Sequence, residues 1–243
     1  MSKVIKIYGE RNSGTNYFSQ LLSENFDIQL LPGKLDTNSI FTFNEWTKDV
    51  FFKLNRNKNL GWKHAYIDIN LILAHSMKPI VITLTKNPYS FLLSLYKRPY
   101  HYKGQLPDSF YNFLKNSWYV RGRDNYDLKY YKNPIELWNN KNSSYIKLKE
   151  TNIKHLIFTY EELLKDPNKV LIKISENCDL ELNKEFSNIN FSTKNDNKNF
   201  FDYQRYYLNE EWRKDISEKE VKFINSQLDD QVMKFFNYSK INF

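Results

Sequence analysis

The sequence has little cysteine and little glycine, and it has no long apolar run. A single cysteine, Cys178, in 243 residues excludes an intramolecular disulfide framework and a cysteine-based zinc site, and it fits a reducing compartment. Only 6 glycines exclude collagen-like or glycine-rich low-complexity sequence. The longest apolar stretches, such as 79–84, are too short to span a bilayer, and residues 1–6 lack the apolar segment of a signal peptide. We therefore expect a soluble, cytoplasmic protein without stable membrane insertion.

Aromatic and basic residues are abundant. Aromatics make up 17% of the chain, so it can bury enough apolar surface to offset the entropy of folding. Lys and Arg number 36 against 28 Asp and Glu, and the resulting net charge of +8 favours anionic partners such as nucleotides, acidic glycans, nucleic acid or a membrane surface. Because the basic residues are dispersed among acidic ones rather than gathered into a stripe, we expect no nucleic-acid partner.

Apolar runs and helical periodicities alternate along the chain. They predict strands over 4–8, 60–66, 79–85 and 155–159. They predict helices containing 17–22 and spanning 69–75, 90–96, 108–118, 134–150, 161–165, 167–178 and 217–236, with one short helix in the irregular segment 31–59. No linker or repeat divides the chain. We therefore predict an α/β protein with a single domain, 1–243, in which helices flank a mostly parallel central sheet.

The segment after the first strand has the spacing of a phosphate loop, with Gly9 and Gly14 in the frame G-x-x-x-x-G-K-[ST]. Thr15 replaces the lysine of that frame, and Asn16 replaces the Mg²⁺-binding hydroxyl residue. These replacements argue against a P-loop nucleotide kinase or NTPase. What remains is a row of backbone amides at a helix N-terminus, which suits a single phosphate, with Arg11 as a bidentate partner. The alternative is an ordinary strand-to-helix turn whose glycines only permit positive φ.

Two segments together resemble a known family. GERNSGTNYF at 9–18 resembles the 5′-phosphosulfate loop of sulfotransferases, particularly bacterial members related to carbohydrate sulfotransferases, which use 3′-phosphoadenosine-5′-phosphosulfate (PAPS). The segment 81–96 is similar to the family's 3′-phosphate motif, in which a basic residue ends a strand and a serine lies eight positions later. Residues 61–64 and 158–167 match more loosely. The family usually has arginine where this chain has Lys86, which is a point charge rather than a planar fork.

The resemblance implies a P-loop-like sulfotransferase fold and a set of nucleotide ligands. It assigns the 5′-phosphosulfate to the loop residues Arg11, Asn12, Ser13, Gly14, Thr15 and Asn16. It assigns the 3′-phosphate to Lys86 and Ser94. No clean copy of the basic, glycine-containing C-terminal loop of cytosolic members is present, and Lys194 and Lys198 are the nearest candidates. PAPS would be the co-substrate, and no metal is required.

The resemblance also implies a catalytic base that accepts the proton of the acceptor. His64 is the preferred base, because the pair Lys63-His64 resembles the Lys-x-His of cytosolic members, although without the intervening residue. Glu24 is the competing base, because many carbohydrate-type members use a glutamate just after the first helix. Lys63 serves the leaving oxygen or faces solvent, and Arg98 and His101 line an acidic acceptor site or form a solvated turn. His64 could also be a buried structural histidine.

The predicted function is metal-free, in-line transfer of a sulfuryl group from PAPS to a hydroxyl, or an amine, of a small-molecule, saccharide or glycolipid acceptor. The saccharide assignment depends on the resemblance to bacterial members alone. The alternatives are a P-loop nucleotide kinase or NTPase, a non-catalytic nucleotide- or nucleic-acid-binding protein, and a sulfotransferase fold that binds without turnover. The sequence does not indicate the oligomeric state.

Overall fold

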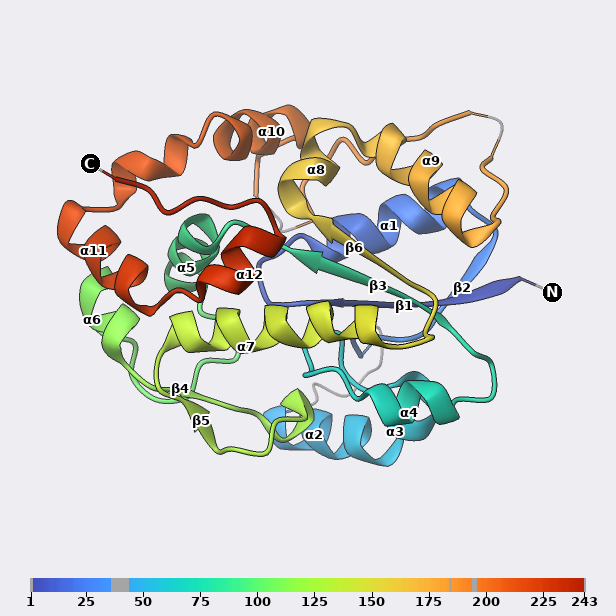
Figure 1. Ribbon diagram of the computed structural model, residues 1–243, viewed down its shortest axis with the longest axis horizontal. Helices are drawn as coiled ribbons and strands as arrows, with labels where there is room; N and C mark the ends of the chain where they lie inside the picture. The colour runs from blue at the N-terminus through green and yellow to red at the C-terminus, as the bar shows by residue number, and fades with distance from the viewer. Residues whose placement is uncertain (1, 36–43, 184, 194–195, 243) are drawn as a thin grey trace.

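The computed structural model describes residues 2–35, 44–183, 185–193 and 196–242. Its centre is a four-stranded, all-parallel sheet with the strand order β2-β1-β3-β6 (Figure 1). The strands are β1 (Lys3–Gly9), β2 (Ile28–Leu30), β3 (Ile80–Thr85) and β6 (His155–Thr159). A two-stranded antiparallel ribbon pairs β4 (Trp118–Tyr119) with β5 (Tyr130–Tyr131).

Helices occupy most of the remaining described chain. They are α1 (Thr15–Asn25), α2 (Glu45–Leu54), α3 (Arg56–Asn59), α4 (Ile69–Ala74), α5 (Pro88–Lys97), α6 (Phe110–Lys115), α7 (Pro134–Ile146), α8 (Tyr160–Lys165), α9 (Pro167–Cys178), α10 (Phe200–Leu208), α11 (Glu218–Gln227) and α12 (Asp230–Phe235). Short 3-10 turns are η1 (Gly122–Asp124), η2 (Lys147–Glu150) and η3 (Glu211–Asp215). Their ends follow local rules. At α5, for example, the Asn87 side chain accepts from the first-turn amides and Pro88 occupies the first helical position.

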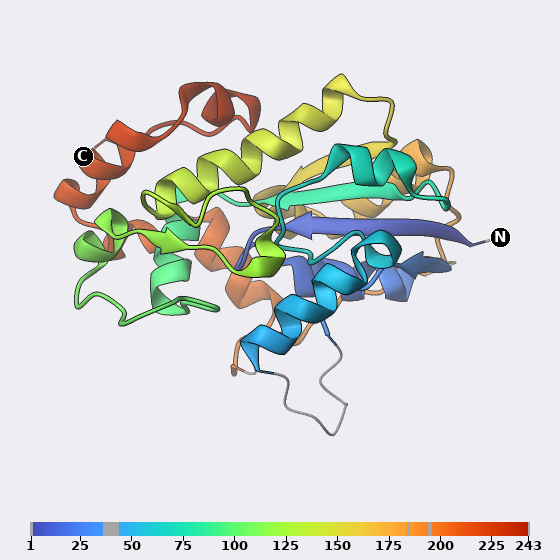
Figure 2. The same ribbon diagram turned by 90° about the horizontal axis from the view of Figure 1, so that it is seen from below.

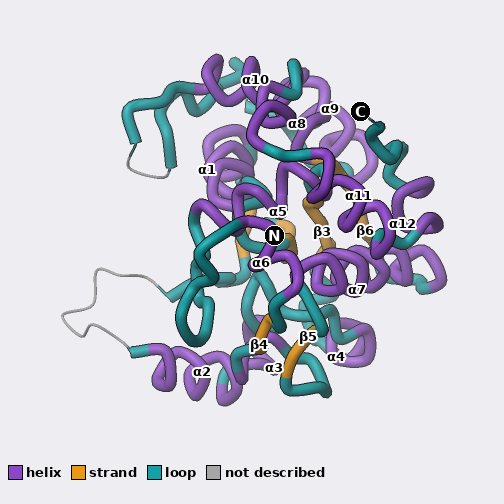
Figure 3. The backbone as a smooth tube through the Cα atoms, turned by 90° about the vertical axis from the view of Figure 1, so that its left-hand side faces the viewer, coloured by secondary structure: helices purple, strands orange, loops and turns teal. Residues whose placement is uncertain are grey.

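Both faces of the sheet are covered. Alternate residues of β1 point to opposite faces, so Ile5 and Ile7 pack in one apolar cluster with α1 and α9, whereas Tyr8 packs in a second cluster with α4 and α7. Figures 2 and 3 show α1 on one side of the sheet and α4 and α7 on the other. The predicted fold class, a mostly parallel sheet flanked by helices, is confirmed. None of the described helices is long and apolar enough to cross a membrane.

The register of the sheet aligns the ends of its central strands. Gly9 of β1 pairs with Leu84 of β3, and Thr85 of β3 pairs with Thr159 of β6. The loop after β1, residue 86 after β3 and the start of α8 therefore emerge side by side at one edge of the sheet. This edge holds the candidate site.

Several details differ from the sequence prediction. The range 60–66 is not a strand, because Leu60 and Gly61 both have positive φ (58° and 78°) and turn the chain. The short strand β2 and the helix α10 were not predicted. The segment 31–59 contains α2 and α3 rather than one helix, although residues 36–43 lie outside the described part.

Candidate functional site

The loop after β1 presents the N-terminus of α1. Gly14, the residue before α1, has φ 90°, and no side chain caps the helix. A Cβ at Gly14 would lie 2.4 Å from the ring of Tyr160, so both the backbone conformation and the space require glycine. Within the described chain, the amides of 14–17 have no hydrogen-bond acceptor. Uncapped amides at a helix N-terminus form a site for an anion.

The Arg11 side chain does not point at this anion site. Its guanidinium is 1% exposed and forms ion pairs with Glu10 (Nη1–Oε1, 2.6 Å) and with Asp124 of η1 (Nη2–Oδ1, 2.9 Å). Its Cζ lies 4.6 Å from the ring centre of Trp62 and 5.5 Å from that of Trp118. Two carboxylates thus pair with the Nη atoms, whereas the buried Nε has no hydrogen-bond partner in the described chain. The expectation that this fork pairs with phosphate stays a prediction.

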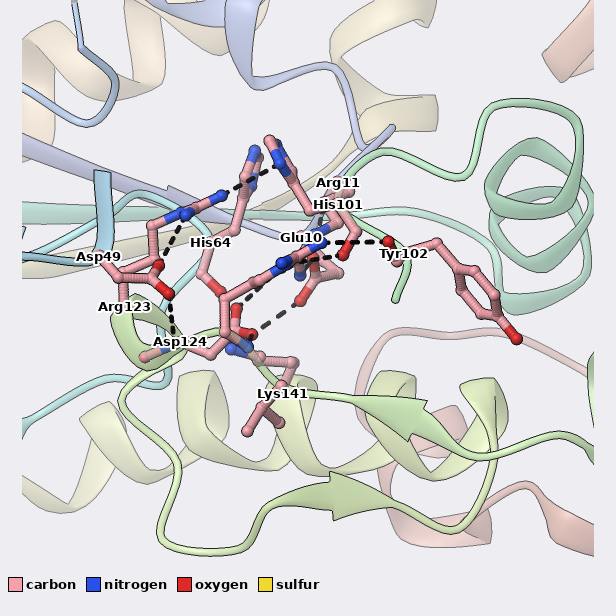
Figure 4. A network of polar contacts seen from close by, with 12 residues as sticks. Glu10, Arg11, Asp49, His64, His101, Tyr102, Arg123, Asp124 and Lys141 are labelled. Carbon is pink, nitrogen blue, oxygen red and sulfur yellow. Dashed lines mark hydrogen bonds and ion pairs between the residues drawn. The ribbon is translucent and has the colours of Figure 1, made fainter. Parts of the chain in front are cut away.

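Arg11 belongs to a buried network in which the cations Arg11 and Lys141 are paired with the carboxylates of Glu10 and Asp124 (Figure 4). Lys141 of α7 lies 3.9 Å from Glu10 and donates to the backbone carbonyl of His64 at 2.6 Å. Burial alone would raise the pKa of Asp124, but the neighbouring Arg11 and Lys141 cations lower it instead. The network connects the loop after β1 to η1, α7 and the segment that carries His64. Its role in the site is to position those elements.

Trp62 is the aromatic centre of the same region. The Arg123 guanidinium lies 4.2 Å from its ring centre, and the rings of His64 and His101 pack edge-on against it at 4.8 and 5.0 Å. Arg123 also forms ion pairs with Glu45 and Asp49 of α2 (Figure 4 shows the contact with Asp49). These contacts hold α2 against the site.

His64 is buried with a defined tautomer. Its Nδ1 contacts the carbonyl oxygen of Gly9, which can only accept, so Nδ1 carries the proton and Nε2 presents a lone pair. Nε2 bonds to no other described residue. Burial, with the nearby Lys63 and Arg11 cations, lowers the pKa of His64 well below 6.5. A neutral imidazole with a free Nε2 can accept a proton at neutral pH.

Lys63 supplies a cation beside the loop. Its Nζ donates to the side-chain oxygen of Asn16 in the first turn of α1, and its backbone carbonyl accepts from the Gly9 amide at 2.9 Å. Burial and the neighbouring Lys34 lower the pKa of Lys63 to about 7. Because Lys63 is buried and its Nζ contacts the first turn of α1, the side chain lies at the anion site and not in solvent.

The second predicted cradle is assembled at the end of β3. Lys86 Nζ donates to Ser94 Oγ at 2.8 Å and to the Tyr207 hydroxyl at 3.1 Å, and it lies 3.4 Å from the carbonyl oxygen of Asn12. Lys86 is 1% exposed and forms no ion pair in the described chain. Burial lowers its pKa to about 7, although Glu161 opposes this shift. A buried cation without a paired anion is a site that favours an anionic ligand.

No hydrogen bond or ion pair joins Glu24 or Lys198 to Lys86 or to the loop after β1 in the described chain. Glu24 is exposed near the C-terminus of α1, about 13 Å along the helix from Thr15 at 1.5 Å per residue. The first helix thus places this carboxylate at its far end from the loop, and the assignment of Glu24 as a base stays a prediction that this position does not favour. Lys198 lies before α10 with Nζ 5.5 Å from the ring centre of Tyr206, and Lys194 lies outside the described residues.

The remaining loop residues and the basic turn have their own partners. The Ser13 hydroxyl donates to the Glu10 carbonyl, and the Asn12 side-chain amide donates to the Arg98 carbonyl at 3.0 Å. Arg98 pairs with Asp196 at 2.8 Å. His101, whose φ is 65°, contacts Glu45 at 3.0 Å through Nδ1. Burial and nearby arginines lower the pKa of His101 to about 4. The His101 side chain is mostly buried, whereas the Arg98 side chain is 38% exposed beside Asp196.

Three groups that build the site were not predicted from the sequence. They are the Glu10 and Asp124 carboxylates that pair with Arg11, the ammonium group of Lys141, and the hydroxyl of Tyr207. Tyr207 could have been found, because Phe200, Tyr203 and Tyr207 follow a helical spacing in α10. No local pattern in the sequence indicates that Asp124 and Lys141 contact the loop after β1.

Comparison with known proteins supports the fold. No protein-family model matches the chain, and no curated protein does. The structure is similar to that of mouse sulfotransferase SULT7A1 complexed with PAP, with a TM-score of 0.59 and 16% identity over 98% of this chain and 90% of that one. It is also similar to the sulfotransferase domain from the curacin biosynthetic pathway, with a TM-score of 0.53 and 11% identity over 99% of both chains. At these identities, the similarity establishes an α/β fold shared with sulfotransferases.

Proposed function

We propose that this protein is a PAPS-dependent sulfotransferase of one domain, 1–243, that transfers a sulfuryl group to a hydroxyl, or an amine, of a saccharide or glycolipid acceptor. The proposal rests mainly on Lys86, a buried lysine that forms no ion pair in the described chain and lies between Ser94 and the loop after β1. The buried Glu161 carboxylate acts on its pKa but does not pair with it. A 3′-phosphate supplies that anion. The neighbouring amides of 14–17 then receive the 5′-phosphosulfate of the same nucleotide.

Two further observations agree with this reading. The strands that carry the two cradles are adjacent, so Lys86 Nζ lies 3.4 Å from Asn12 in the first cradle, and one nucleotide can contact both. The crystal structure of mouse SULT7A1 is a complex with PAP, which is the nucleotide that remains after sulfuryl transfer from PAPS. The saccharide or glycolipid acceptor still depends on the sequence resemblance.

In the proposed reaction, the acceptor hydroxyl gives its proton to His64 Nε2 while its oxygen forms a bond to sulfur. The bond between sulfur and the bridging oxygen breaks, and its electron pair stays on the 5′-phosphate of the leaving 3′,5′-adenosine bisphosphate. Lys63 and the α1 amides stabilise the charge that develops there. Arg11 acts indirectly, by holding the loop through Glu10 and Asp124.

Calorimetric titration tests the proposal. We expect 3′,5′-adenosine bisphosphate to bind without divalent metal and more tightly than ATP–Mg²⁺, and Lys86→Met to abolish this binding. Lys97→Met is the matched control, because Lys97 lies on α5 in an exposed ion pair with Asp215. Preference of the wild type for ATP–Mg²⁺ would show that the proposal is wrong. Transfer of radiolabelled sulfate from PAPS to a panel of saccharides and glycolipids then tests the acceptor class.

A further inference from the structure

Tyr207 lies inside the cradle at the end of β3. Its hydroxyl is 3.1 Å from Lys86 Nζ and 3.3 Å from Ser94 Oγ, and Lys86 and Ser94 are 2.8 Å apart. Three hydrogen-bonding groups thus converge: Lys86 from the end of β3, Ser94 from the helix α5 that follows it, and Tyr207 from α10, 121 residues away from Lys86. The Lys86 Nζ atom is also 4.2 Å from the centre of the Tyr207 ring.

Packing explains the ring of Tyr207 but not its hydroxyl. The ring is buried and lies edge-on against Tyr160 at 5.2 Å and against Tyr206 at 5.0 Å, contacts that phenylalanine would also make. Among the residues that the structure describes, the hydroxyl bonds only to Lys86 and Ser94, the two residues assigned to the phosphate. Since Lys86 forms no ion pair in the described chain, a hydroxyl placed between it and Ser94 is in position to bind an anion that Lys86 holds.

We propose that Tyr207 is a specificity-determining residue, whose hydroxyl donates to the 3′-phosphate and distinguishes a 3′-phosphorylated adenosine from one with a free 3′-hydroxyl. In the ligand-free protein the hydroxyl accepts from Lys86. A phosphate beside Lys86 accepts hydrogen bonds from Lys86 Nζ and from the hydroxyl groups of Tyr207 and Ser94. A free 3′-hydroxyl carries no charge and cannot accept from all three groups, so the cradle binds it weakly.

The inference rests on the proposed function, and its test compares two nucleotides that differ only in the 3′-phosphate. The affinities for 3′,5′-adenosine bisphosphate and for 5′-AMP are measured by calorimetry in the wild type and in Tyr207→Phe. Loss of one hydrogen bond to a charged group should weaken binding of the bisphosphate about tenfold or more, and leave binding of 5′-AMP within about twofold. Tyr206→Phe, a matched change one residue away, should alter neither affinity.

The outcomes separate the two proposals. A wild type that binds neither nucleotide overturns the proposed function and this inference together. A wild type that prefers the bisphosphate, with a Tyr207→Phe variant that weakens both nucleotides equally or neither, overturns the inference alone. If Tyr207→Phe does not fold, 3-fluorotyrosine at position 207 retains the hydroxyl. Its fluorine resonance should then shift on binding of the bisphosphate but not of 5′-AMP, and a resonance that neither moves contradicts the assignment.

Discussion

A lysine that is kept for ligand binding should destabilise the ligand-free protein, and Lys86 allows this to be measured. An exposed lysine has a pKa near 10.5, whereas burial lowers that of Lys86 to about 7. At pH 7 this difference costs the folded state about 4 kcal/mol. In the variant Lys86→Met an apolar side chain of similar length removes that cost.

The same substitution also removes favourable contacts. Lys86 donates to Ser94 and to Tyr207, each bond contributing about 1 kcal/mol, and it donates more weakly to the Asn12 carbonyl at 3.4 Å. Ser94 and Tyr207 still face each other at 3.3 Å in the variant, so neither hydroxyl is left alone. We therefore expect Lys86→Met to stabilise the ligand-free protein by about 2 kcal/mol, which in a chain of this length raises Tm by about 6 °C.

Urea unfolding followed by circular dichroism, without nucleotide, measures this difference. Lys97→Met is the control and should change the free energy of unfolding by less than about 0.5 kcal/mol, because its ion pair is exposed. The stabilisation by Lys86→Met should shrink as pH rises from 7 towards 10.5, since the unfolded chain then loses the proton that the folded protein binds weakly. If Lys86→Met instead destabilises the protein by more than about 1 kcal/mol, Lys86 is a structural residue and the argument for an anion site fails.

Three further predictions concern the site. His64→Ala should lower single-turnover sulfuryl transfer about 100-fold or more while affinity for 3′,5′-adenosine bisphosphate stays within about threefold; unchanged transfer would rule out His64 as the base. Calorimetry at increasing pH should show bisphosphate affinity falling by at least about tenfold per pH unit above 7, because Lys86 and Lys63 then lose their charges before binding, and a flat profile would contradict this. Asp124→Asn should destabilise the protein by about 3 kcal/mol in urea unfolding, because it leaves the buried Arg11 and Lys141 charges with a single carboxylate partner; a loss below about 1 kcal/mol would show that the network is not needed.

Local patterns in the sequence determined most of the secondary structure. Runs such as 155–159 and the proline-started helix 167–178 agree with β6 and α9 residue by residue, because strand and helix preferences depend on neighbours within one or two turns. The same patterns placed the Gly9–Asn16 loop and Lys86 at strand ends. Since parallel strands align their carboxyl ends, the position of the candidate site followed from the sequence.

Only the tertiary structure decided which side chains face that site. Asp124, 113 residues from Arg11, accepts a hydrogen bond from the Arg11 guanidinium. Tyr207, 121 residues from Lys86, accepts a hydrogen bond from Lys86 at the end of β3. Spacing alone could not reveal either pairing, because a buried charge takes whichever opposite charge or hydrogen-bonding group the fold brings close. Helix geometry likewise carried Glu24 away from the loop. The chemistry of the site therefore depends on long-range burial, whereas its location depends on local sequence.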